Sequence, residues 1–428
     1  MIIDYIFIFF CTIITIISYY KIVFKKNSSI GYYVIIVIYI FMVIPIILNY
    51  TSGLPTYVNM VWYNPFIEPM KNSNVNVLYD FYIMITIVMI FIYSSKISKK
   101  IVRGYGKENA SYLSFVDNNF ISGLLILSPI ILILLRGNFR NYLEYNISSE
   151  RGLYDGNYFT STTPYMILSM LVFFAKFYKD KITFKKVILT LIYGFIIVWI
   201  SGKRFMIANL IFMIILYVTN LNIKKRTRKK LFLIIPILLI FLIMFCVFYL
   251  TKIRPLATNS TQNLYDCLRI DFGRDDVTKY AIQEKIIFNH DILEYPGQSF
   301  LSILLFFIPR SLWINKPYSH YLYLTSSVFN VPIESLDFGI TPSIFEMSIF
   351  NFGIYGFFIT PLLLMILCYF CDKNKSIDIK ALWLLCIIVL LTQSMSSYII
   401  IIFLLLFIKI LKIILKNKKF KIVWGSKL

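Results

Sequence analysis

LFLIIPILLIFLIMFCVFYL, residues 231–250, is a run of twenty residues without a charge. A helix needs about twenty apolar residues to cross about 30 Å of hydrocarbon, where its backbone groups must bond to one another. The run therefore predicts a transmembrane helix over 231–251.

Comparable apolar runs recur along the whole chain. Of the 428 residues, 59% are hydrophobic and 15% are charged, with a mean hydropathy of +0.75, which is more apolar than a soluble core requires. Helices are predicted over 3–22, 30–50, 78–95, 119–135, 160–178, 186–201, 204–220, 231–251, 344–370, 380–394 and 398–416. The polar stretches SGKR at 201–204 and QSMSS at 393–397 separate neighbouring helices. The sequence predicts an all-α integral membrane protein, a polytopic bundle of about eleven transmembrane helices with one large outer loop.

The net charge of +22 would suggest nucleic acid in a soluble protein, so its distribution decides its meaning. When the predicted helices are threaded alternately, most Lys and Arg residues fall in short loops on one side and most acids fall on the other. Short cytoplasmic loops retain Lys and Arg, so the basic side is predicted to be cytoplasmic and the chain to start outside. The excess of positive charge is thus explained by the positive-inside distribution of Lys and Arg, and no nucleic-acid partner is expected.

Three regions follow from this threading. Residues 1–251 hold helices 1 to 8 with short loops, 252–343 form the large extracytoplasmic loop, and 344–428 hold helices 9 to 11 and a basic cytoplasmic tail. The loop is too long to be a mere connector. Within it, TKYAIQEKIIFN at 278–289 has helical spacing, and SFLSILLFFI at 299–308 is too short to cross and is expected to lie in the interface.

Five cations are predicted at the outer surface, against the positive-inside trend. Lys203 and Arg204 lie in the SGKR break, and Arg254 follows the span predicted over 231–251. Arg310 and Lys316 lie in FIPRSLWINKP. Snorkelling to lipid headgroups would explain any one of them alone. The set favours an anionic ligand, because the planar fork of Arg fits phosphate oxygens.

Outer carboxylates and histidines are candidates for a general base. They are Asp266, Asp271, Asp275, Asp276, His290, Glu294, His320 and Glu346. Each has a plainer interpretation: DFGRDD at 271–276 as a solvated turn, the histidines as loop residues, and Glu346 as part of helix packing. Sequence spacing does not choose among them.

Three stretches, taken in order with the large outer loop, carry a family resemblance. SGKRFMIANL at 201–210, IPRSLWINKP at 308–317 and GITPSIFEMSIFNFGIYGFF at 339–358 resemble the Wzy-type O-antigen and capsular polysaccharide polymerases, also called oligosaccharide repeat unit polymerases. The motifs cover about a tenth of the chain, and their order and the helix count extend the likeness over most of it.

The resemblance implies an enzyme, a membrane glycosyltransferase on the outer face of the bacterial cytoplasmic (inner) membrane. It would transfer a glycan from undecaprenyl pyrophosphate to the next lipid-linked repeat unit, building O-antigen of lipopolysaccharide or a capsule. The lipid pyrophosphate would bind Lys203, Arg204, Arg254, Arg310 and Lys316. The catalytic candidates would be Arg204, Arg310, Asp271, Glu294, His290 and Glu346, with the base left open.

The partners implied are the undecaprenyl-pyrophosphate-linked oligosaccharide, the bilayer, and a chain-length regulator and a flippase of the same pathway. No metal site or cofactor is expected, since the outer acids are scattered and the lipid-linked donor needs no nucleotide.

Two alternatives remain open. An O-antigen ligase would use the same donor, and a His in the outer loop would favour it. A flippase or exporter of the lipid-linked unit should instead carry charged groups deep within several helices.

Overall fold

The computed structural model describes residues 2–25, 28–54, 64–104, 119–135, 165–178, 183–201, 204–220, 225–248, 265, 268–269, 272–305, 307–336, 339–374 and 376–392. All regular structure within these residues is helical. The described part of the chain is therefore an all-α protein, as the apolar runs predict.

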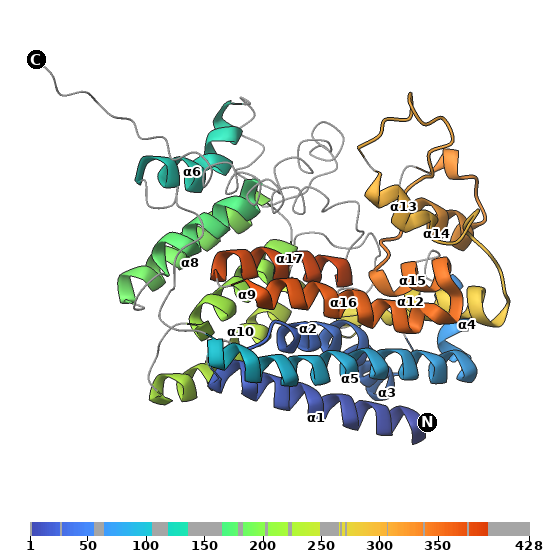
Figure 1. The fold of residues 1–428 in the computed structure, drawn as a ribbon, viewed down its shortest axis with the longest axis horizontal. Helices are drawn as coiled ribbons and strands as arrows, with labels where there is room; N and C mark the ends of the chain where they lie inside the picture. Colours follow the sequence, from blue (N-terminus) through green and yellow to red (C-terminus); the bar gives the residue numbers. More distant parts are fainter. Residues whose placement is uncertain are drawn as a thin grey trace, which may run out of the picture.

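The long helices lie side by side and roughly parallel (Figure 1). α1 (Ile2–Phe24) packs against α2 (Gly31–Ile38) and α5 (Ser73–Gly104), and α5 packs against α16 (Gly356–Lys373). The π-helical turn η1 (Tyr39–Val43) joins α2 to α3 (Ile44–Ser52).

Four helical stretches in the described residues are long and apolar enough to cross a membrane. They are Ile2–Phe24, Gly31–Ser52, Ser73–Ile97 and Ile344–Lys373. Shorter apolar helices cover Asn119–Leu135, Tyr165–Phe177 and Met206–Asn220. Length and apolarity of this kind indicate a helical membrane protein.

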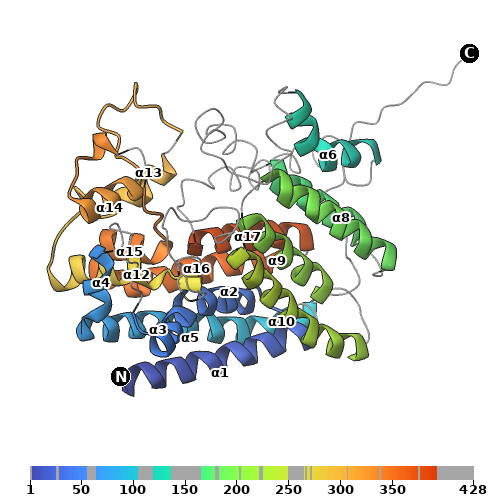
Figure 2. The ribbon, with the colours of Figure 1, turned by 180° about the vertical axis from the view of Figure 1, so that it is seen from behind.

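A second group of helices lies beside the first, as the view from behind shows (Figure 2). It contains α6 (Asn119–Leu135), α8 (Phe184–Ser201), α9 (Arg204–Asn220) and α10 (Lys225–Phe248). α10 contacts both α9 and α1. α8 ends and α9 begins on either side of Gly202 and Lys203, where SGKR predicts a break.

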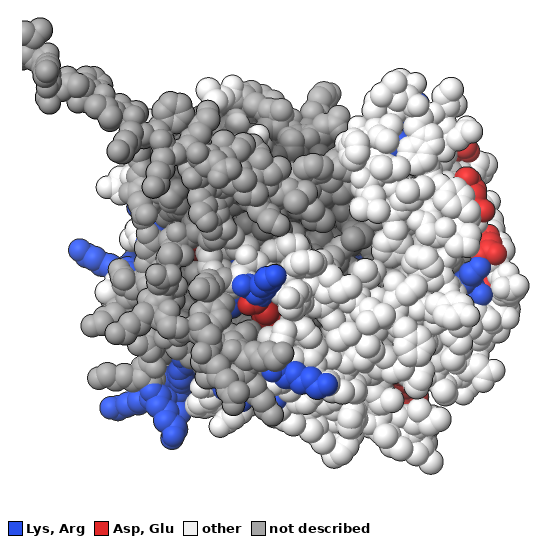
Figure 3. All heavy atoms as spheres, viewed as in Figure 1, with Lys and Arg blue, Asp and Glu red and all other residues white. Residues whose placement is uncertain are grey.

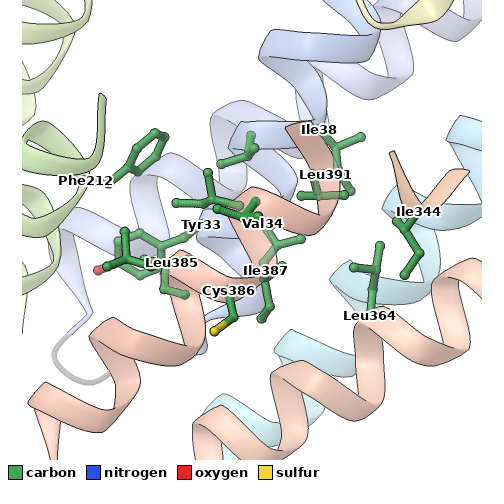
Figure 4. Packing of buried hydrophobic residues seen from close by; sticks show 14 of the residues in the cluster. Tyr33, Val34, Ile38, Phe212, Ile344, Leu364, Leu385, Cys386, Ile387 and Leu391 are labelled. Atoms are coloured by element: carbon green, nitrogen blue, oxygen red, sulfur yellow. The ribbon is translucent and has the colours of Figure 1, made fainter. Parts of the chain in front are cut away.

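α17 (Ile377–Thr392) connects the two groups, since it contacts α2, α9 and α16. In Figure 4, Leu385 and Ile387 of α17 lie close to Tyr33 and Val34 of α2, with Phe212 of α9 nearby. Nearly every side chain of α17 is buried. Close packing on several sides accounts for the apolar run of this helix after Lys380.

The described part of the predicted outer loop is not an open connector. It folds into α12 (Asp275–Ile282), η6 (Gln283–Ile287), α13 (Gln298–Leu304), α14 (His320–Phe329) and η7 (Ile333–Ser335). These elements gather with α4 (Asn64–Lys71) and α15 (Ile344–Phe352) at the end of the molecule where α1 starts (Figure 1). The helix predicted within 278–289 is confirmed by α12 and η6. α13 leaves Leu304 71% exposed, and the interfacial position of 299–308 stays a prediction.

Two predicted helices differ from the observed ones. The stretch predicted as one helix over 344–370 is interrupted by the 3-10 turn η8 (Gly353–Tyr355), where Gly353 has φ +56° and a Cβ on Gly356 would meet the Ser348 carbonyl oxygen at 2.6 Å. The stretch predicted over 30–50 contains η1, just before Pro45. The helix predicted over 398–416 and the QSMSS hairpin lie outside the described residues, so the number of about eleven helices stays a prediction.

Charges are sorted along the bundle (Figure 3). Lys and Arg gather towards one end, where α10 opens with KRTRKK at 225–230. The acids visible at the opposite end lie along the edge formed by the outer-loop elements. This distribution is the one that positive-inside sorting produces.

Candidate functional site

A buried group of charges lies at the start of α12. We call it the α12 cluster; its members are Arg269, Arg274, Asp275, Asp276 and Lys279. All but Arg274 are at most 5% exposed. A buried ionisable group is either paired or has a shifted pKa, so the partners of each member decide what it can do.

A proline in the preceding span helps to place this cluster. Pro45 has no N–H for the carbonyl of Phe41, four residues earlier. That carbonyl oxygen accepts a hydrogen bond from the Arg274 backbone N–H, at 3.2 Å. The hydroxyl of Tyr79 donates to the next carbonyl, that of Met42, at 2.8 Å. The irregular turn η1 thus provides one acceptor that docks the start of α12 and a second that binds α5.

Arg269 is held on all sides. Its Nη1 and Nη2 lie 2.7 and 2.9 Å from the two carboxylate oxygens of Asp275, and its Nε donates to Asn49 Oδ1 at 3.0 Å. Lys279 Nζ lies 3.4 Å from Asp275 Oδ2 and 5.0 Å from the ring centroid of Tyr79. The forked pair of Arg269 and Asp275 therefore closes Arg269 onto the start of α12, and Arg269 has little capacity left for a ligand.

Gly273 allows this closure. A Cβ at this position would collide with the guanidinium and the carbonyl of Arg269, while its own N–H donates to the Arg269 carbonyl at 2.8 Å. Phe272, beside it, is 9% exposed. The interpretation of DFGRDD as a solvated turn is wrong for the described residues 272–276, because Arg269 and α12 draw this turn into the interior.

The two neighbouring aspartates differ electrostatically. Burial raises the pKa of Asp275, but the charges of Arg269 and Lys279 outweigh burial and hold the pKa below its ordinary value. Burial raises the pKa of Asp276 to about 6, against the attraction of Arg269 and with the help of the Asp275 charge. Its Oδ1 accepts only the Val277 N–H, at 2.8 Å.

Glu346 is committed to structure. It completes a capping box at the start of α15, accepting hydrogen bonds from the Ser343 N–H at 2.6 Å and from the Ser343 hydroxyl. Its other oxygen accepts from Thr278 Oγ1, at 2.6 Å. Both oxygens are occupied, so this carboxylate joins α12 to α15 and favours the packing interpretation.

A second buried network surrounds His320 at the start of α14. Its Nδ1 lies 2.8 Å from Ser299 Oγ, and the Ser299 N–H donates to Asn351 Oδ1 at 3.1 Å. Gln298 donates to Tyr323 OH at 2.8 Å. Burial lowers the pKa of His320 to about 3, so this imidazole is neutral at pH 7. It ties α13, α14 and α15 together.

Two of the predicted cations lie on the exposed segment after α13. The Arg310 guanidinium carbon lies 4.2 Å from the centroid of the Tyr318 ring, and the residue is exposed. No carboxylate in the described part of the chain pairs with Arg310. Lys316 is half-buried and donates to the Ile308 carbonyl at 2.6 Å. Arg310 is therefore presented to the exterior on an aromatic surface.

The other base candidates with described side chains are exposed. His290 Nδ1 lies 3.0 Å from Glu284 Oε2. Glu294 accepts from Tyr323 OH at 3.1 Å. Neither residue lies in a buried site.

Several predicted residues cannot be placed. Lys203, Arg254, Asp266 and Asp271 lie outside the described residues, and of Arg204 only the backbone is described, at the first position of α9.

Sequence reasoning missed Arg269, Arg274 and Lys279. Their alternation with acids over 269–279 was the available signal, but it is typical of a solvated face as well.

Within the described residues no group of three or more His, Cys, Asp or Glu side chains is arranged to hold a metal ion. Cys368 and Cys371, the CxxC pair, are both free thiols and fully buried.

A groove of about 330 Å³ lies elsewhere, between α6, the Tyr165–Phe177 helix and α8. Its lining is apolar except for Lys176 and Tyr193. In Figures 1 and 2 these helices lie far from α12, so the groove is separate from the α12 cluster.

No family model matches the chain, and neither does any curated protein or solved structure.

Proposed function

We propose that this chain is a membrane glycosyltransferase that polymerises undecaprenyl-pyrophosphate-linked oligosaccharide repeat units. The product is O-antigen or capsular polysaccharide, and the reaction takes place on the outer face of the bacterial cytoplasmic membrane. The proposal includes a bundle of about eleven spans with the α12 end outside. It rests on the sequence resemblance together with one structural observation, the exposure of Arg310.

Arg310 supplies the chemistry that the donor requires. When a sugar leaves undecaprenyl pyrophosphate, negative charge grows on the diphosphate and has to be stabilised. An exposed guanidinium without a carboxylate partner in the described residues is available for this, and its fork matches two phosphate oxygens. Lys316 lies six residues along, and Lys203, Arg204 and Arg254 join the set from the sequence.

The position of charges within the long helices favours surface chemistry over transport. In the four candidate spans most charged side chains sit towards the ends, at Asp4, Lys21, Lys96, Glu346, Asp372 and Lys373, and Asp80 is the exception. A carrier should line a path across the bilayer with such groups. Sugars would also find stacking surfaces beside Arg310, where Tyr318 is half-buried.

The test is complementation of a deletion strain, with surface glycan separated by electrophoresis. We expect wild-type protein to restore the ladder of long chains, and Arg204→Ala or Arg310→Ala to leave single repeat units. Arg310→Lys should restore little, because an ammonium cannot make the forked contact. A matched control is Arg226→Ala, in the basic segment at the opposite end of the molecule.

Other outcomes identify other functions. A normal ladder in both Ala variants would contradict the proposed site. A deletion strain with bare core would indicate a ligase, and one that accumulates the lipid-linked unit inside would indicate a flippase.

A further inference from the structure

Two described acids at the α12 end of the molecule are buried and keep a carboxylate oxygen without a donor among the described residues, Asp276 on α12 and Asp80 on α5. Asp80 lies within a candidate membrane span, whereas Asp276 lies outside the candidate spans. Asp275 and Glu346 have both oxygens occupied by cations or hydroxyl and backbone donors. Glu284, Asp291 and Glu294 are paired on or near the surface. Asp276 is 5% exposed, yet its Oδ2 has no donor among the described residues, and its Oδ1 accepts only from the adjacent N–H. It is a shielded carboxylate with an unused oxygen.

We infer that Asp276 accepts the proton of the attacking hydroxyl group of the acceptor sugar. This inference rests on the proposed function and adds the general base to it. The hydroxyl oxygen forms a bond to the anomeric carbon of the donor sugar, and its proton passes to Asp276 Oδ2. The bond between that carbon and the phosphate oxygen breaks, and its electron pair leaves with undecaprenyl pyrophosphate.

The surroundings hold Asp276 in place. The preceding residue, Asp275, is clamped by Arg269, and Arg274 is bonded through its N–H to the Phe41 carbonyl. Two residues later, Thr278 is bonded to Glu346. Asp276 therefore lies on a segment that is fixed on both sides, as preorganised catalysis requires. Arg274, half-buried beside it, offers a guanidinium whose Nε has no partner in the described residues.

The electrostatics suit a base. Burial raises the pKa of Asp276 to about 6, so that it is ionised at pH 7 and a stronger base than an exposed aspartate. The charged and titratable groups of its own segment and of the elements packed on α12 include Arg269, Arg274, Asp275, Lys279, Tyr280, Tyr39, Glu68, Lys71, Tyr79, Asp80, Tyr82, Glu284, Lys285 and Glu346. Arg269 and Arg274 lower this pKa and Asp275 raises it.

The experiment measures polymer formation by purified protein in liposomes supplied with undecaprenyl-pyrophosphate-linked repeat unit. We expect Asp276→Asn to slow chain growth by about 100-fold or more, the usual contribution of a general base. Its Kd for the lipid-linked unit should stay within about threefold of wild type. Asp276→Glu should recover part of the rate, and Glu334→Gln, an exposed control, should match wild type.

The pH profile separates a base from a structural residue. For the wild type, the rate should fall about tenfold per pH unit below about pH 6. A rate for Asp276→Asn within threefold of wild type would overturn the inference. If that variant does not fold, the wild-type profile decides, since a level rate from pH 7 to pH 5 would also overturn it. Wild-type protein that forms no polymer would instead refute the proposed function itself.

Discussion

At the scale of single residues, pairing separates structural charges from available ones. Arg269 and Asp275 share two short contacts in a site without solvent. Removal of one partner of such a pair leaves the other as an uncompensated buried charge. By contrast, the Arg310 guanidinium has no carboxylate partner among the described residues, and Asp276 Oδ2 has no donor among them.

The first prediction concerns this pair. Asp275→Asn should lower the free energy of unfolding by about 3–5 kcal/mol, because Arg269 and Lys279 lose their counter-charge. Glu334→Gln should change it by less than about 0.5 kcal/mol. Thermal unfolding of the detergent-solubilised protein measures both, and equal stability of the two variants would contradict the pairing.

The second prediction concerns His320 and pH. An unfolded His has a pKa of about 6.5, whereas burial holds the pKa of His320 in the fold at about 3. Between these values only the unfolded state binds the proton, so stability is greatest above about pH 6.5 and falls as the pH is lowered. From pH 7 to pH 5 the free energy of unfolding should fall by about 2 kcal/mol through His320.

The comparison with His320→Asn isolates this effect, since Asn does not titrate and keeps a polar group near Ser299. The variant should be less sensitive to acid than wild type in the same unfolding measurement. The raised pKa of Asp276 makes the fold more stable as the pH is lowered, which opposes the effect of His320. Asp276 is present in both proteins, so its effect cancels in the comparison. An identical acid sensitivity would show that His320 is not the group responsible.

At the scale of elements, prolines in apolar helices create attachment points. The carbonyls four residues before Pro45, Pro129 and Pro236 belong to Phe41, Leu125 and Phe232. They accept hydrogen bonds from the Arg274 N–H at 3.2 Å, from Ser128 Oγ at 2.8 Å and from Tyr19 OH at 2.5 Å. A carbonyl without its helical donor must find another one inside a membrane protein. Only the first of these three bonds joins a long helix to the outer-loop elements.

The third prediction follows from that difference. Pro45→Ala restores an N–H that competes with Arg274 for the Phe41 carbonyl, and it should also remove the cost of proline within a helix. We expect thermal stability to be kept while polymer formation falls by about tenfold or more, because the start of α12 loses its anchor. Pro129→Ala is the control, since the Leu125 carbonyl that Pro129 leaves without a helical donor accepts from Ser128 within α6. Equal activity of the two variants would mean that the anchor does not matter.

At the scale of the whole molecule, the bundle is polarised. In Figure 3, Lys and Arg gather towards one end, and acids lie along the edge at the opposite end. If the protein is inserted as proposed, this distribution follows from the retention of Lys and Arg in cytoplasmic loops.

The fourth prediction tests this polarity. Reporter fusions at position 270 should read as extracytoplasmic and fusions at position 225 as cytoplasmic. Alkaline phosphatase and green fluorescent protein fusions measure this in cells. The opposite pattern would place the α12 cluster inside and remove the basis for chemistry at the outer face.

The amino-acid sequence alone predicts a helical membrane protein, most positions of the described helices and the segments that hold the candidate residues. These properties depend on local composition: twenty apolar residues predict a span wherever they occur, and α8 ends at Ser201 and α9 begins at Arg204, as the polar stretch SGKR predicts. The resemblance and the five cations also come from short stretches.

Which of the charges near α12 are paired and which are available depends on contacts that form only in the fold. Arg269 meets Asn49 across 220 positions of sequence, and Thr278 meets Glu346 across 68. No local pattern encodes such contacts, so Asp275, Asp276 and Glu346 look alike in the sequence. Their different partners and burial make one an ion-pair partner, one a shielded carboxylate with an unused oxygen and one a helix cap, because the charge of a carboxylate is set by what surrounds it.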